Sequence, residues 1–72
     1  MIAEIRRLLA ARPFVPFIIY PSDGAELQVP TVDHAAVSPD GRPVVVRFDD
    51  GTAQFLFPLL IARVATRVVN PS

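Results

Sequence analysis

The chain has 72 residues, enough for one domain, and an apolar content of 51%, which is high for a domain of this size. Its formal net charge is zero, which argues against both a strongly basic nucleic-acid binder and a strongly acidic protein. There is no cysteine and a single histidine, which excludes disulfides, thiolate zinc sites and histidine clusters. We therefore expect no metal and no cofactor.

The chain opens with apolar residues at helical spacing. Ile2, Ile5 and Leu8 fall on one stripe of a helical wheel, and Pro13 prevents the helix from continuing. The pattern predicts a helix over residues 2–12. A helix this short is not stable alone in water, so its stripe must pack on the rest of the domain.

Short runs of β-branched and aromatic residues follow, separated by prolines and turn residues. They predict strands at residues 16–20, 25–29, 35–38, 44–49, 53–57 and 63–69. Every glycine follows an aspartate, at Asp23-Gly24, Asp40-Gly41 and Asp50-Gly51, and this pair favours tight reversals. We predict a single mainly β domain over residues 1–72. It is a small bent antiparallel meander, or an SH3-like or Sm-like barrel, of 5–6 strands with one N-terminal α-helix.

Three motifs punctuate this order: Arg12–Ile19 reads R-P-F-V-P-F-I-I, S-D-G follows, and Val37–Arg42 reads V-S-P-D-G-R. Over residues 2–68 the chain resembles a group of short uncharacterised bacterial proteins with R-P-F-x-P-F-x-I, S-D-G and a V-x-P-x-G-R-like turn. The resemblance implies no catalytic or binding residues. In that group the position of Ile18 is often polar. The element order is also similar, in topology alone, to Sm-like and SH3-like barrels.

The sequence lacks the residues that an enzyme needs. His34 is the only side chain that titrates near neutral pH, and its neighbour Asp33 points the opposite way on an extended segment. The pair Asp49-Asp50 is typical of a hairpin turn, where aspartates bond the backbone and face water. We predict a protein that is not an enzyme, with no catalytic residues. A barrel of six strands is also too narrow inside for a small-molecule substrate.

Strand parity predicts an apolar surface. Alternating large apolar residues are assigned to the core, namely Phe17, Ile19, Val44, Val46, Phe48, Phe55 and Phe57. Their apolar neighbours then point outward, namely Ile18, Tyr20, Val45 and Leu56. Such a patch typically marks an interface, so we predict a homo-oligomer that acts as an assembly or protein-interaction module, in which a protein partner is also possible. The helix over residues 2–12 is the alternative cover for the same patch.

A second hypothesis is a barrel that binds RNA or another nucleic acid. Arg47, Arg63 and Arg67 form a basic strip if they share an outer face, with Tyr20 as the one aromatic side chain placed for stacking. The balanced charge makes a nucleic-acid partner the less favoured of the two. The longest apolar run is too short to cross a bilayer and the start does not read as a secretory signal, so we expect a cytoplasmic protein with no membrane partner.

Overall fold

The computed structural model describes residues 1–40 and 43–66. Its elements are α1 (Ile2–Ala10), β1 (Phe17–Pro21), β2 (Leu27–Val29), the 3₁₀ turn η1 (Val32–His34), β3 (Ala35–Val37), β4 (Val44–Arg47), β5 (Ala53–Leu56), the 3₁₀ turn η2 (Pro58–Leu60) and β6 (Ile61–Thr66). The mainly β fold with one N-terminal helix and six strands is therefore confirmed.

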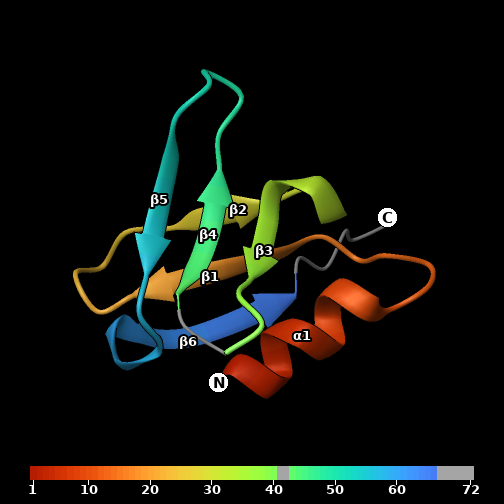
Figure 1. The fold of residues 1–72 in the computed structure, drawn as a ribbon, viewed down its shortest axis with the longest axis horizontal. Helices are drawn as coiled ribbons and strands as arrows, with labels where there is room; N and C mark the ends of the chain where they lie inside the picture. The colour runs from red at the N-terminus through yellow and green to blue at the C-terminus, as the bar shows by residue number, and fades with distance from the viewer. Residues whose placement is uncertain (41–42, 67–72) are drawn as a thin grey trace, which may run out of the picture.

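The six strands form two antiparallel sheets of three strands each. The strand order is β2-β1-β6 in one sheet and β3-β4-β5 in the other. Figure 1 shows the strands of the second sheet crossing in front of those of the first. In the first sheet β1 pairs with β6 as well as with β2, so strands that are far apart in the sequence lie side by side. Within the described residues the strands therefore form two separate sheets and do not close into one hydrogen-bonded barrel.

Two of the three Asp-Gly pairs are seen between paired strands, as predicted. Gly24 and Gly51 have φ of 89° and 90°, a conformation that side chains rarely adopt. In each turn the aspartate completes the reversal, because its Oδ1 accepts a hydrogen bond from the backbone N–H two residues on, at 2.9 Å in both cases. The third turn joins β3 to β4, and its Gly41 and Arg42 lie outside the described residues.

The core lies between the two sheets, and every helix and strand contributes to it. The buried apolar residues are Ile5, Leu8, Phe17, Ile19, Leu27, Val29, Ala35, Val44, Val46, Leu56 and Ile61. On β1 and β2 the buried residues alternate with more exposed ones, which is the pattern of a sheet with one dry face.

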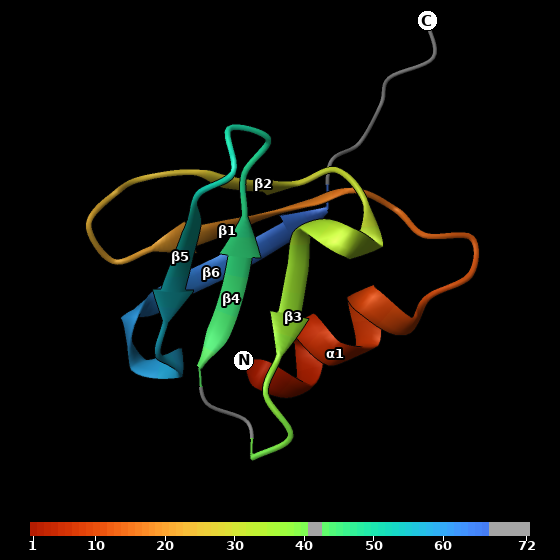
Figure 2. The ribbon, with the colours of Figure 1, turned by 45° about the horizontal axis from the view of Figure 1, so that its top comes forward.

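Helix α1 closes one side of the gap between the sheets. It lies beside β3 (Figure 2), and Ile5 and Leu8 point into the core from its apolar stripe. It ends at Ala10, two residues earlier than predicted. The Arg12 guanidinium caps that end by donating to the carbonyls of Leu9 and Ala11 at 3.0 and 2.8 Å. Arg6 also reaches the Ser38 carbonyl at 3.1 Å, which ties the helix to the end of β3.

The strand bounds differ from the predicted ones mainly at their ends. The final strand begins at Ile61, two residues before the predicted start. Its predicted continuation over residues 67–69 lies outside the described residues, together with Arg67. Asp49 belongs to the turn after β4 and not to the strand. The longer turn changes the pairing of β5 with β4, and with it the side chains of β5 that face the core.

Candidate interaction surfaces

The register between β4 and β5 decides which face of β5 is dry. Val44 pairs with Leu56, and Val45 pairs with Phe55. Residues that are directly paired point to the same face of a sheet, and Val44 is completely buried. Leu56 is consequently in the core, with 3% of its surface exposed, while Phe55 is 65% exposed. The prediction that Leu56 points outward and that Phe55 and Phe57 point inward is wrong.

The cause of this error is the length of the hairpin loop. The predicted turn has two central residues, Asp50 and Gly51, which places Phe55 opposite Val46 and therefore in the core. The observed loop has three residues, because the Phe48 N–H donates to the Thr52 carbonyl at 2.9 Å. One extra loop residue moves the register by one, and in a strand that exchanges the two faces.

This register leaves an apolar surface around β5, which we name the β5 patch. We define it as Phe55 on β5, its cross-strand partner Val45 on β4, and Phe57, which directly follows β5. Phe57 is 54% exposed, and its backbone is still extended. The η2 turn follows the patch directly and adds Leu59 and Leu60, which are 94% and 51% exposed. Residues 52–61 contain no charged side chain. Large exposed apolar residues grouped in this way mark interfaces more often than scattered ones do.

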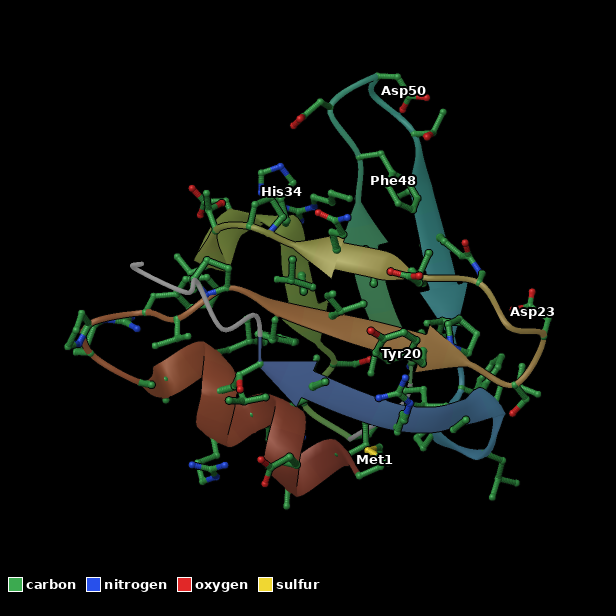
Figure 3. All side chains as sticks on the ribbon, turned by 180° about the vertical axis from the view of Figure 1, so that it is seen from behind. Met1, Tyr20, Asp23, His34, Phe48 and Asp50 are labelled. Carbon is green, nitrogen blue, oxygen red and sulfur yellow. The ribbon has the colours of Figure 1, made fainter. Side chains whose placement is uncertain are left out.

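Two of the predicted interface residues lie on the other sheet. Ile18 and Tyr20 are half-buried on the outer face of the β2-β1-β6 sheet. The Arg63 guanidinium lies 3.8 Å from the centre of the Tyr20 ring, a cation–π contact with its cross-strand neighbour. In Figure 3 Tyr20 projects from β1 on the side turned toward the viewer. One face of the ring is therefore already occupied and is not free to stack on a base.

The predicted arginine strip is not formed by its two described members. Arg63 stacks on Tyr20, whereas Arg47 ends β4 of the other sheet. Arg47 lines a shallow pocket of about 280 Å³ together with the acidic side chains of Glu26 and Asp49. These acids break the run of positive charge that phosphate binding requires. Arg67, the third member, lies outside the described residues.

The same pocket holds His34, which links two distant segments. Its Nε2 is 2.8 Å from the Asp49 carboxylate, and its Nδ1 is 2.7 Å from the Thr31 hydroxyl. A carboxylate only accepts, so Nε2 donates to Asp49. This arrangement holds the β4–β5 hairpin against η1 (Figure 3). The acid that contacts His34 is thus Asp49, fifteen residues away, and not its neighbour Asp33.

Charged groups at the surface are stabilised by local partners. The Thr52 hydroxyl, with the Thr52 backbone N–H, holds the pKa of Asp50 below its ordinary value. On α1 the pKa of Glu4 is lowered mainly by its hydrogen bond with Arg7, and the pKa of Arg7 is raised by the same contact. The Glu4–Arg7 pair lies on α1, whereas the Asp50–Thr52 pair lies in the turn directly before β5. Arg47 is the charged residue of β4 that shares the outward parity of Val45, and it is paired with Ala53 of β5.

The four predicted interface residues are therefore divided among three places. Ile18 and Tyr20 share one sheet face, Val45 lies on the other sheet, and Leu56 is in the core. Parity reasoning missed Phe55 and Phe57 as surface residues. The signal that identifies them is the three-residue loop before β5.

Comparisons with protein-family models, with curated proteins and with solved structures found no match to this chain. In the described part of the chain, no helix has the length and apolarity needed to span a membrane.

Proposed function

We propose that this protein is a non-enzymatic assembly module that self-associates through the outward apolar residues at the β5 side of the β3-β4-β5 sheet. The observation that carries the proposal is the β5 patch. Phe55 is 65% exposed on a strand that has no charged residue, and Phe57, the residue that follows this strand, is 54% exposed. Exposure of two aromatic rings to water is unfavourable, and a second protein surface removes it.

The size of the domain supports the same proposal. A core of a chain below about 70–80 residues rarely supplies more than about 3–5 kcal/mol, and small domains commonly add stability by oligomerisation. Among the described residues eleven apolar ones are buried while seven large ones stay exposed, and four of the seven, namely Phe55, Phe57, Leu59 and Leu60, lie at β5 and η2. Burial of the exposed set between copies adds to the core without any new covalent or metal link.

Helix α1 does not remove the need for a partner at this surface. Its buried residues face the core beside β3, and β5 lies at the far end of that sheet (Figure 1). The helix and a second copy were the two alternatives for covering the outward apolar residues, and the helix does not cover those of β5. A second copy of the chain is the cover that we propose.

Nucleic-acid binding is the weaker proposal. Arg47 shares its pocket with two acids, and the Arg63 guanidinium already lies on the Tyr20 ring. Neither arrangement favours a phosphate backbone or a stacked base. Absorbance at 260 nm of the purified protein, after elution at low salt, tests whether nucleic acid copurifies.

The first test is the Phe55→Asp variant, whose mass is measured by light scattering over a range of concentrations. We expect the parent to be a dimer or a larger assembly and the variant to be a monomer, because a buried carboxylate at the interface is strongly unfavourable. The matched control is Ala3→Asp, which adds the same charge on the exposed side of α1 and should leave the assembly intact.

Two results would contradict the proposal. A parent protein that is monomeric at every concentration shows that the patch has no self-partner. A Phe55→Asp variant with the mass of the parent shows that assembly uses another surface. The Phe55→Thr variant guards against loss of folding, since threonine favours strands and also removes the ring.

A further inference from the structure

Strand β5 offers a free backbone edge as well as an apolar face. It lies at the end of the β3-β4-β5 order, and none of its four residues is charged. Natural proteins usually protect an edge strand with charge, proline or a covering element. The opposite edge of the same sheet has such protection, because α1 lies beside β3 and Arg6 donates to the Ser38 carbonyl. The unprotected state of β5 therefore points to a strand partner.

The hydrogen bonds of the hairpin show which backbone groups of β5 point to that edge. The Phe48 N–H donates to the Thr52 carbonyl, and bonded pairs alternate along an antiparallel ladder. The next bonded pair is therefore Val46 with Gln54. The bonds on the other side of β4 agree with this alternation. The Pro43 carbonyl accepts from the N–H of Ser38, the residue after β3, so odd-numbered residues along β4 bond to β3 and even-numbered ones bond to β5.

It follows that the N–H and C=O groups of alternate residues on β5 face away from β4. Gln54 and Leu56 direct theirs to β4, whereas Ala53 and Phe55 direct theirs to the open edge. Phe57 continues this alternation, since its backbone is extended at φ −85° and ψ 147°. Its carbonyl already accepts from the Leu60 N–H at 2.9 Å, and its N–H points to the edge.

We infer that β5 pairs antiparallel with β5 of a second copy, about a two-fold axis that passes through the Phe55 pair. This inference rests on the proposed self-association and specifies its geometry. Phe55 then exchanges two hydrogen bonds with the partner subunit's Phe55, and each Phe57 N–H donates to an Ala53 carbonyl across the interface. The β3-β4-β5 sheet of one copy and that of the other then join as one antiparallel sheet.

The register follows from the positions of the outward groups. A shift by one residue places the outward groups of one strand opposite groups that are directed to β4, so the edges do not bond. A shift by two residues keeps only two of the three outward residues in the ladder, because the third then lies opposite the Asp50-Gly51 turn or opposite η2, where the backbone is not extended. Pairing centred on Phe55 uses all three outward residues and sets the large Phe57 opposite the small Ala53.

A second copy fits this edge better than an unrelated partner does. An antiparallel edge is its own complement under two-fold symmetry, and a neutral strand does not repel its copy. With about 200 Å² for a fully exposed aromatic side chain, the exposed fractions of Phe55, Phe57 and the two η2 leucines amount to on the order of 500 Å² per copy. These side chains of two copies therefore supply at most about 1,000 Å², which is close to the lower bound for a specific interface.

The test is a synthetic chain with N-methyl-phenylalanine at position 55. This change keeps the ring and leaves the bonds between β5 and β4 in place. It replaces the N–H that points to the edge by an N-methyl group, which removes the donor and blocks the approach of a partner strand. We expect the dissociation constant of the dimer, measured by sedimentation, to rise by about tenfold or more. The Phe55→Ala variant is the matched comparison, since it removes the ring and keeps the N–H.

A second measurement determines the register directly and uses the parent sequence, so it needs no substituted chain. In a mixed dimer with one isotope-labelled copy, an intermolecular Hα–Hα contact is expected between Gln54 and the partner subunit's Leu56. These residues form the close, non-bonded pair on either side of the two-fold axis. Contacts at other residues overturn the register.

The outcomes separate the inference from the proposal on which it rests. A parent that is dimeric and insensitive to N-methylation overturns edge pairing and leaves self-association through the β5 patch in place. A parent that is monomeric overturns both. A monomer that binds an added extended peptide at β5 identifies the edge as a site for another protein's strand and overturns the proposal of a second copy.

Discussion

At the scale of single residues, aspartate and glycine each have a separate role in the Asp23-Gly24 and Asp50-Gly51 turns. Glycine supplies the positive φ, and space around Gly24 and Gly51 is open, so only backbone conformation selects glycine there. The aspartate before each glycine accepts the N–H two residues on, which would otherwise lack a partner within the loop. This is why Asp23-Gly24 and Asp50-Gly51 correctly predicted reversals of the chain.

The Asp50 turn gives a prediction for pH dependence. Its folded pKa lies below the ordinary value because the Thr52 hydroxyl, at 2.6 Å, and the Thr52 N–H donate to the carboxylate. The resulting stabilisation is fully present above the unfolded pKa and is lost as the pH falls through the folded pKa. In Thr52→Val we expect the pKa of Asp50 to rise toward its ordinary value, as followed by NMR titration of its side-chain carbon.

Thr52→Ser is the control for that titration, because it keeps the hydroxyl and should keep the lowered pKa. An Asp50 pKa that is the same in the valine variant as in the parent would show that the hydroxyl is not the main cause. The backbone N–H of residue 52 remains in both variants, so we expect only part of the shift to disappear.

At the scale of elements, the sequence predicts the presence and order of the helix and strands, but one register incorrectly. Proline, glycine and β-branched residues mark where each element begins and ends, and these signals are local. The face of β5 depends on whether its loop has two or three residues, and Asp49-Asp50-Gly51 permits both. A hydrogen bond between Phe48 and Thr52 decides it. The size of a phenylalanine ring does not identify it as a core residue when the register places it outside.

The orientation of β5 predicts a large loss of stability for one of two adjacent truncations and a small loss for the other. Leu56→Ala removes a side chain that is 3% exposed in the core, so the free energy of unfolding should fall by about 2–5 kcal/mol. Phe55→Ala removes an exposed ring, so the cost should stay below about 1 kcal/mol when urea unfolding is measured at concentrations where the chain is monomeric. The reverse order of costs would show that Phe55, and not Leu56, faces the core.

At the scale of the whole molecule, contacts between distant segments are what the sequence pattern could not reveal. β1 lies between β2 and β6, which pairs the first strand with the last, and His34 bonds to Asp49 across fifteen residues. Neither contact leaves a spacing signal, because the first depends on the strand order within the β2-β1-β6 sheet and the second on the β3–β4 register, which sets Ala35 opposite Val46. The structure therefore supplies the strand order, and with it the division of the predicted interface residues between the two sheets and the core.

Self-association makes the stability of the whole molecule depend on protein concentration. For a dimer that unfolds to monomers, mass action raises the midpoint of thermal unfolding by about 4 °C for each tenfold increase in concentration of a chain of this length. We expect this shift for the parent and for Ala3→Asp, measured by circular dichroism at several concentrations. Phe55→Asp should unfold at a midpoint that does not change with concentration, because its monomer has no partner to lose. A parent midpoint that stays constant over a hundredfold range would mean that the β5 patch remains exposed to water in the working protein, and the assembly role would have to be abandoned.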